Sequence, residues 1–350
     1  MRIICCIIII IILLIIKHYY IKYIYYKYLC SYNYNSIFNK KCSNIFIKNI
    51  NNNNLHIQEY DKNYDTIVLS LHGFASHGNR KPHEYLKKKL NENNIEYITF
   101  DFTGHGYSDG DKGNIKDINI LINDVLLILI YIYNNNIVPI KSLFIYGHSM
   151  GGSFAIIIGD LLTNKKNNFD IFNKNRDLFY KKIIPSFKGL ILLAPLIQFN
   201  FNKICYNISK FIFNIFPKFT IPSFIYDQTD SYHKFWKDDK YIEYIKYDGN
   251  KYNKKRLGYS ENININTLLR LHDLSITVQD KIKNLDCSFI VLHDKNKDIL
   301  ISKKSIDFLI NFSKSSNKKY VNIKESLHDP LANQPNITIF NIIKWIKTQI

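Results

Sequence analysis

FIYGHSMGGSF, residues 144–154, joins an apolar run typical of a strand to a turn in which a serine has glycine two positions away on each side. The strand-like run ends at Tyr146, and an apolar segment of helical length begins at Met150. In so sharp a turn, side chains at the flanking positions would collide with the neighbouring strand and helix, so glycine is required there. The stretch therefore predicts a strand, a tight turn and a helix, with Ser149 at the tip of the turn.

Ser149 is a candidate nucleophile in this position. Residues 147–151 match the pattern G-x-S-x-G, in which a strand-turn-helix unit exposes a serine hydroxyl above a sheet. The start of the helix supplies backbone N–H groups that favour a developing negative charge. A hydroxyl is a weak nucleophile unless a base takes its proton and an acid orients that base, so two partners should follow in the chain.

A second glycine motif lies upstream, in LSLHGFASHG at residues 69–78. His72 and Gly73 end an apolar strand, where the loop can direct the backbone N–H of Phe74 toward the turn. Together with the N–H of Met150, it would form an oxyanion hole with two donors, each stabilising a transition state by about 3 kcal/mol. We expect the imidazole of His72 to be structural.

Three motifs occur in order: LSLHGFASHG, then FDFTGHGYSDG at residues 100–110, then GHSMGG at residues 147–152. With this order and spacing, residues 55–350 resemble the α/β-hydrolase superfamily, specifically its monoglyceride lipase and lysophospholipase-like (serine aminopeptidase-like) branch. The resemblance implies an α/β fold with a mostly parallel central sheet, helices on both faces and an inserted cap. In that family the middle motif shapes a turn beside the active site, so Asp101, His105 and Ser108 are expected to be structural.

The resemblance also places an acid and then a histidine after the serine. KESLHDPL, residues 324–331, puts His328 just after the last predicted strand, where the family keeps its catalytic histidine. For the acid the family usually shows H-G-x-x-D, whereas this chain reads LHDKNKDIL at residues 292–300. The apolar pair at 299 and 300 favours Asp298 as the acid, with Asp294 as the alternative if the loop is shifted.

Short apolar runs that alternate with segments of helical length also indicate a parallel sheet covered by helices. Strands are expected at residues 66–71, 96–100, 142–146, 189–193, 288–292 and 319–323. Helices are expected at residues 82–90, 115–133, 150–162, 303–312 and 337–346. Two ranges do not fit: 164–186 reads as a charged low-complexity insert, and 196–283 is long enough to form a cap.

The N-terminus carries a separate signal. The apolar run at residues 3–16 follows Arg2 and precedes Lys17, a pattern similar to a secretory signal, but it is shorter than the roughly 20 residues of a spanning helix. An uncleaved signal anchor within residues 1–30 is the leading interpretation, a cleaved signal peptide the second and a buried soluble helix the third. The first two predict membrane association or the secretory pathway rather than the cytoplasm. The asparagine-rich residues 31–54 read as a linker.

The formal net charge of +18 would suit a partner rich in phosphate. The lysines, however, are scattered through loops beside asparagine, with no basic helix or interleaved aromatic platform. This pattern disfavours nucleic-acid binding.

The resemblance implies a serine ester hydrolase that forms an acyl-enzyme intermediate and uses no metal or organic cofactor. FIFNIFPKFTIPSFIY, residues 211–226, would suit a cap that lines an acyl-chain tunnel or, equally, a cap packed on its own core. A monoacylglycerol or lysophospholipid is the leading substrate class. A short-chain esterase, a peptidase-like hydrolase and a non-catalytic binding protein of the same fold remain alternatives.

Overall fold

A computed structural model describes Lys17, Tyr20 and residues 44–164, 169–199, 201–221, 232–250, 252–253, 255–259 and 262–350. Apart from Lys17 and Tyr20, the predicted signal anchor or signal peptide at residues 1–30 lies outside the described part of the chain.

The centre of the molecule is a six-stranded sheet in which every neighbouring pair is parallel. Its strands are β3 (Thr66–Leu71), β4 (Glu96–Thr99), β5 (Ser142–His148), β6 (Phe187–Leu193), β7 (Phe289–His293) and β8 (Lys318–Asn322). They lie in the order β4-β3-β5-β6-β7-β8. The predicted α/β class with a mostly parallel sheet is therefore confirmed, and each strand matches a predicted one.

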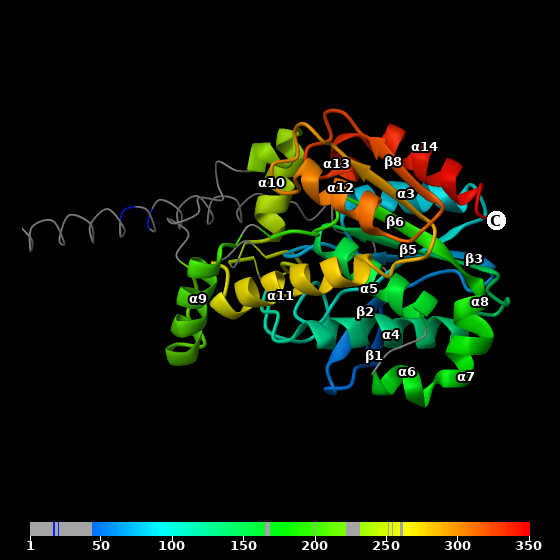
Figure 1. Cartoon of the computed structure of the whole chain (residues 1–350), viewed down its shortest axis with the longest axis horizontal. Helices are drawn as coiled ribbons and strands as arrows, with labels where there is room; N and C mark the ends of the chain where they lie inside the picture. Colours follow the sequence, from blue (N-terminus) through cyan, green and yellow to red (C-terminus); the bar gives the residue numbers. More distant parts are fainter. Residues whose placement is uncertain are drawn as a thin grey trace, which may run out of the picture.

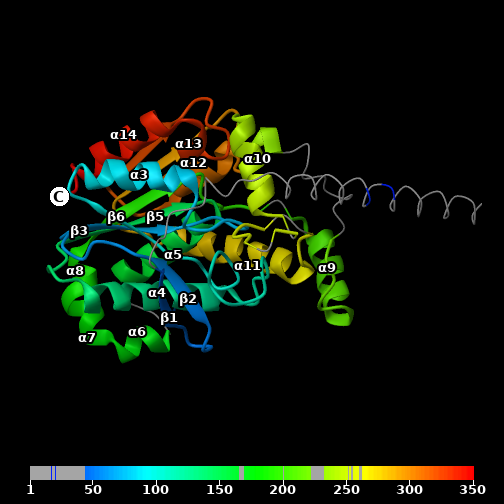
Figure 2. The same ribbon diagram turned by 180° about the vertical axis from the view of Figure 1, so that it is seen from behind.

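The sheet is buried on both faces because successive side chains of each strand point into opposite cores. In β5, for example, Ile145 enters one core while Phe144 and Tyr146 enter the other. On one face lie α3 (Lys81–Asn91) and α14 (Pro335–Ile346), and on the other lie α4 (Ile118–Asn135), α5 (Met150–Asn164) and α11 (Ile265–Ile282) (Figures 1 and 2). Helix α12 (Lys303–Phe312) joins the second group through Ile306 and Leu309, which are buried in the same core. Apart from α11, these helices are the predicted ones.

Among the described residues, α4 is the one helix that has the length and apolarity of a membrane span. It is also a core helix, since Leu121, Val125, Leu126 and Leu129 are buried in the cluster that covers the sheet. Burial within the fold accounts for its apolar composition.

The predicted linker at residues 31–54 is wrong from residue 44 onward, because β1 (Asn44–Lys48) and β2 (Asn54–Gln58) form an antiparallel hairpin there. The asparagines build its turn: the Asn49 side chain accepts the N–H groups of Asn51 and Asn53, at 2.9 and 3.0 Å. Its amide also donates to Asp124 in α4, which anchors the hairpin to the core. Asparagine thus serves here as a turn residue.

The range predicted as a low-complexity insert, 164–186, is helical from Asp170 onward. It contains α6 (Asp170–Lys174), α7 (Arg176–Leu178), the π-helical turn η1 (Phe179–Ile183) and α8 (Ile184–Ser186). Phe172 and Phe179 are buried and stacked, with ring centroids 4.2 Å apart. The charged segment therefore has a buried apolar face, formed by these aromatic residues.

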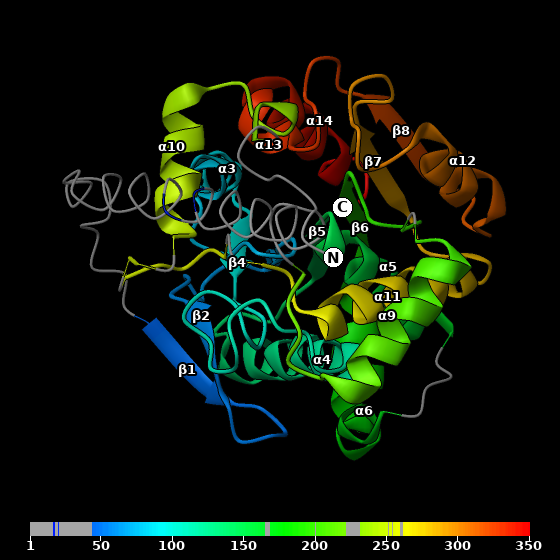
Figure 3. The same ribbon diagram turned by 90° about the vertical axis from the view of Figure 1, so that its left-hand side faces the viewer.

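The predicted cap at residues 196–283 contains α9 (Lys203–Ile215), the short turn η3 (Tyr232–Lys234) and α10 (Asp239–Asp248), which lie at one end of the molecule (Figure 3). The last part of the range is different: Leu271, Leu274 and Val278 of α11 are buried in the core beside α5. Residues 265–282 therefore cover the sheet, and the cap prediction is wrong for that segment.

Candidate active site

Ser149 lies between the end of β5 and the start of α5. Its φ of 52° places the serine in the left-handed region, which is strained for a residue with a side chain. Backbone hydrogen bonds hold this conformation: the Ser149 N–H donates to the carbonyl of Leu193 at 3.0 Å, and its carbonyl accepts from Leu196 at 3.0 Å. The neighbouring strand β6 and the segment after it thus fix the turn.

The flanking glycines leave no room for a side chain. A Cβ at Gly147 would lie 2.4 Å from the carbonyl oxygen of Gly151, and one at Gly151 would lie 2.1 Å from the carbonyl oxygen of Leu71 in β3. Both obstacles are backbone atoms, which cannot rotate away as a side chain can. The expected need for glycine on both sides of Ser149 is confirmed.

Replacing Gly151 with alanine should therefore lower the free energy of unfolding by about 3 kcal/mol, because β3 and α5 would have to move apart. Gly159→Ala in the same helix is the matched control, since its Cβ would meet the ends of flexible side chains, Leu190 and Cys287. Urea unfolding followed by circular dichroism measures both changes. Equal stability of the two variants would contradict this account of the turn.

The loop after β3 passes directly beside the serine. A Cβ placed on Gly73 would lie 3.4 Å from the Cβ of Ser149. Met150 is the first residue of α5, so its N–H has no acceptor within the helix. The ring of Phe74 packs edge-on against His105 and Tyr259, with centroids 5.9 and 6.5 Å away. The two predicted oxyanion-hole residues thus belong to segments that flank Ser149.

His72 is fully occupied by backbone contacts. Its Nδ1–H donates to the carbonyl of Gly73 at 2.8 Å, and its Nε2 accepts the N–H of Phe102 at 3.1 Å. Burial lowers the pKa of His72 to about 3, which keeps the ring neutral. These contacts give His72 the structural role expected from the sequence.

Asp101 also has a structural role. Its carboxylate accepts the N–H groups of Gly78 and Tyr107 at 2.7 and 2.9 Å and pairs with Nδ1 of His56 at 2.8 Å. Burial alone would raise the pKa of Asp101, but the hydrogen bond and charge of His56 hold it well below its usual range. The Ser108 hydroxyl donates to the Asp101 carbonyl at 2.5 Å, so the middle motif is held together internally.

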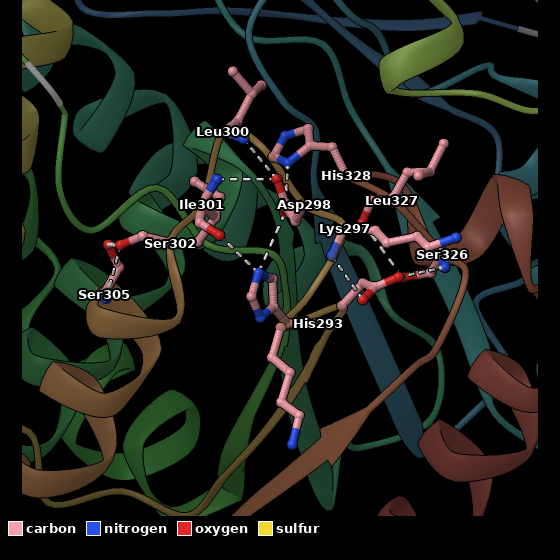
Figure 4. Close-up of polar contacts among 12 residues, drawn as sticks. His293, Lys297, Asp298, Leu300, Ile301, Ser302, Ser305, Ser326, Leu327 and His328 are labelled. Carbon is pink, nitrogen blue, oxygen red and sulfur yellow. Dashed lines mark hydrogen bonds and ion pairs between the residues drawn. The ribbon is translucent and has the colours of Figure 1, made fainter.

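Asp298 and His328 meet across two loops that follow adjacent strands, β7 and β8 (Figure 4). The Nδ1–H of His328 donates to Oδ2 of Asp298 at 3.0 Å, and both side chains are buried. Oδ1 of Asp298 accepts two backbone N–H groups, from Leu300 and Ile301, each at 2.9 Å. Every acceptor of the carboxylate therefore has a defined partner, which fixes the orientation of His328.

The charge of Asp298 is favoured by the same contacts. Burial alone would raise the pKa of its carboxyl group, but the nearby imidazole of His293 and the hydrogen bond from His328 lower it well below its usual range. Asp298 is therefore an anion at neutral pH and can stabilise a positive charge on the imidazole of His328.

Asp294, the alternative acid, organises the loop. Its Oδ1 accepts the N–H groups of Asn296 and Lys297, each at 3.1 Å, and its Oδ2 accepts that of Ser326 at 3.0 Å. These bonds join the β7 loop to the loop that carries His328. The geometry thus brings Asp298 to His328 and gives Asp294 the contacts of a loop residue.

Sequence reasoning missed His293. This histidine is fully buried, and its Nε2–H donates to the carbonyl of Ile301 at 2.9 Å while lying 3.5 Å from Oδ2 of Asp298 (Figure 4). It therefore supports the acid from the side opposite His328. The available signal was its place at the end of a strand, five residues before Asp298.

His148 connects the loop of His328 to the serine turn. Its Nε2–H donates to the backbone carbonyl of His328 at 3.0 Å, and the two rings lie 5.2 Å apart. Burial lowers the pKa of His148 to about 4, so the ring remains a neutral donor. Because His148 directly precedes Ser149, this bond ties the candidate base to the candidate nucleophile.

Comparisons with known proteins give one family match and several relatives of low sequence identity. Residues 62–172 match the family described as serine aminopeptidase, S33. The chain is 24% identical over 288 residues to an uncharacterized abhydrolase domain-containing protein of Dictyostelium discoideum, a match that covers 81% of this chain and 26% of that protein. It is 21% identical to the monoglyceride lipase of Mus musculus, covering 81% of this chain and 83% of the relative.

Solved structures share the fold at low sequence identity. A monoacylglycerol lipase of Paleococcus ferrophilus has a TM-score of 0.63 at 15% identity, covering 85% of this chain and 99% of its own. A soluble variant of monoglyceride lipase from Saccharomyces cerevisiae has a TM-score of 0.62 at 17% identity, covering 88% and 94%. The chain has the α/β-hydrolase fold and is similar to monoglyceride lipases, which confirms the resemblance seen in its motifs.

Proposed function

We propose that this α/β-hydrolase is a serine hydrolase that cleaves carboxylic esters of single-chain lipids. The observation that carries the proposal is the hydrogen bond of 3.0 Å between His328 and the buried anion Asp298, at the sheet edge where the turn bears Ser149. A nucleophile, a base and an acid in this chain order are the working parts of acyl transfer on this fold.

In the proposed reaction, Nε2 of His328 takes the proton of the Ser149 hydroxyl as its oxygen attacks the ester carbonyl carbon. The carbonyl oxygen becomes an anion, which the N–H groups of Phe74 and Met150 would stabilise. The tetrahedral intermediate then expels the alcohol, which receives the proton from His328. Water, deprotonated by the same histidine, attacks the acyl-enzyme and releases the fatty acid.

The lipid substrate is supported by two observations. Two relatives with the same fold are named as monoglyceride or monoacylglycerol lipases. In addition, α9 presents four large apolar side chains on its exposed surface, Ile204, Ile208, Phe211 and Ile215, next to the apolar segment that follows it. A cap of this composition suits an acyl chain better than a small polar ester.

A series of esters that differ only in acyl length tests the substrate class. Each buried methylene contributes about 0.8 kcal/mol before the chain's lost freedom is discounted. We therefore expect kcat/KM to rise by about 100-fold or more from acetyl to decanoyl esters of glycerol, assayed below their aggregation thresholds.

The same series separates the alternatives. A profile that is flat or falls with chain length would contradict the lipase assignment and favour a short-chain esterase. Turnover of aminoacyl amides in place of esters would favour a peptidase-like hydrolase, as the description of the matched family suggests. The Ser149→Ala variant serves as the blank for every substrate.

A further inference from the structure

A buried ion pair lies next to the candidate base. Nη2 of Arg80 is 2.7 Å from Oδ2 of Asp329, and the two side chains are only 6% and 5% exposed. Asp329 directly follows His328, and Arg80 ends the loop that follows β3 and contains Phe74. The pair therefore joins the segment of the predicted oxyanion hole to the loop of His328.

Cap residues complete this ion pair. The indole N–H of Trp236 donates to Oδ2 of Asp329 at 3.0 Å, and Arg80 donates to the hydroxyl of Tyr241. The guanidinium carbon of Arg80 lies 5.7 Å from the ring centroid of Trp236 and 5.5 Å from that of Tyr241. Figure 3 shows α10, which carries Tyr241, beside α3. The charges are thus sealed from water by cap aromatics.

Hydrogen bonds to the remaining donors and acceptors stabilise a buried ion pair. Among the described residues, Nε of Arg80 has no such partner, so the pair depends on its other contacts. The second oxygen of Asp329 accepts the N–H of Ala332 at 3.1 Å, at the start of α13 (Pro330–Asn333). If the cap moved away, Asp329 would lose the Trp236 donor and Arg80 would lose its aromatic cover. Water would then enter and weaken the attraction between the charges.

The position of His328 depends on its neighbours on both sides. Its ring is held by Asp298 and its carbonyl by His148, at 3.0 Å each, while the next residue is held by Arg80. The ring of Phe235, also in the cap, lies 6.1 Å from the His328 ring. Loss of the Arg80 contact would leave the side chain of Asp329 held only by Trp236 and the backbone N–H of Ala332, so the residue that follows His328 could shift.

We propose that Arg80 and Asp329 are positioning residues for His328 and that Trp236 and Tyr241 complete their site, so that the base is held in place only when the cap is seated. The inference rests on the proposed function, since it assigns His328 the role of base. It predicts that the cap controls turnover of every ester, including those too short to contact it.

The test compares acetyl and decanoyl esters on the full chain. Arg80→Met should lower kcat by about 100-fold on both esters, because a displacement of the base by about 1 Å lowers the rate of the chemical step by about that factor. KM should change by less than about twofold. Arg80→Lys, which keeps the charge, should recover part of the loss. Arg176→Met is the matched control: Arg176 also stacks on a tyrosine, Tyr180, but lies on exposed α7, so kcat should not change.

Milder variants test the role of the cap and protect against a folding defect. Trp236→Phe keeps an aromatic ring but removes the donor, and should lower kcat by about tenfold on both esters. In the Arg80→Met background the same change should cost almost nothing, because the two residues act through one site. Thermal unfolding of each variant establishes that it is folded. If Arg80→Met does not fold, the kcat of Trp236→Phe tests the proposal in its place.

Three outcomes would overturn the inference. A loss confined to KM for the decanoyl ester would mean that these residues only shape the acyl site. Wild-type kcat in Arg80→Met or, if that variant does not fold, in Trp236→Phe would mean that His328 does not depend on them. If the wild-type protein hydrolyses neither ester, the proposed function itself fails and the inference falls with it.

Discussion

Replacing Ser149 with alanine should abolish covalent labelling by a fluorophosphonate probe and lower ester turnover by about a millionfold. The hydroxyl is the proposed attacking group, and no other side chain occupies the tip of the turn between β5 and α5. Labelling detected by fluorescence after denaturing electrophoresis measures the first effect, and initial rates on a decanoyl ester measure the second.

Thermal unfolding provides the control for this variant, because Ser149 has a strained φ of 52° that alanine must also adopt. The N–H and carbonyl bonds that hold the turn belong to the backbone and survive the substitution. Equal labelling of the two folded proteins, or no labelling of either, would contradict the proposed nucleophile. The second result would favour a non-catalytic binding protein.

Asp298→Asn should lower kcat by about 10,000-fold while leaving the protein folded. The amide cannot stabilise a positive imidazole, and its NH₂ group would favour the wrong tautomer of His328. Asp294→Asn is the matched control on the same loop. It should lower stability more than turnover, because Asp294 accepts three backbone N–H groups of the loops.

Steady-state rates and urea unfolding of both variants decide between the two carboxylates. A large loss of kcat in Asp294→Asn, with near-normal rates in Asp298→Asn, would mean that the loop is shifted in solution and that Asp294 orients the base. Since the pKa of Asp298 lies below its usual range, acidification to pH 5 should leave its carboxylate ionised. Loss of activity near that pH must then arise from another group.

The centre of the sheet could be predicted from the sequence because β3, β5 and β7 are buried throughout and therefore appear as largely apolar runs. TIVLSL at residues 66–71 is such a run, and its predicted bounds match β3. The β1–β2 hairpin was missed because its turn is built from asparagine, which also dominates the chain's loops. Helix α11 was missed because its buried leucines lie between polar residues within a long segment assigned to the cap.

Local motifs singled out Ser149, Asp298 and His328, and the structure places each of them after a strand of the parallel sheet. Arg80 could not be found in this way. Its importance comes from a partner far away in the sequence, since it pairs with Asp329, 249 residues later. Such a contact leaves no local pattern, since a buried arginine reads the same as a solvated one until the chain is folded.

The contact between Trp236 and Asp329 also allows the position of the cap to be followed by tryptophan fluorescence. The chain has two tryptophans, and the other, Trp345, belongs to α14 and is buried in the core. Indole emission shifts to longer wavelength when the ring becomes solvated, so a Trp345→Phe protein would carry a single emitter located where the cap meets Asp329. The emission wavelength would then report whether the cap covers the ring of Trp236, and its change with time after substrate is mixed in would report the rate of any cap movement.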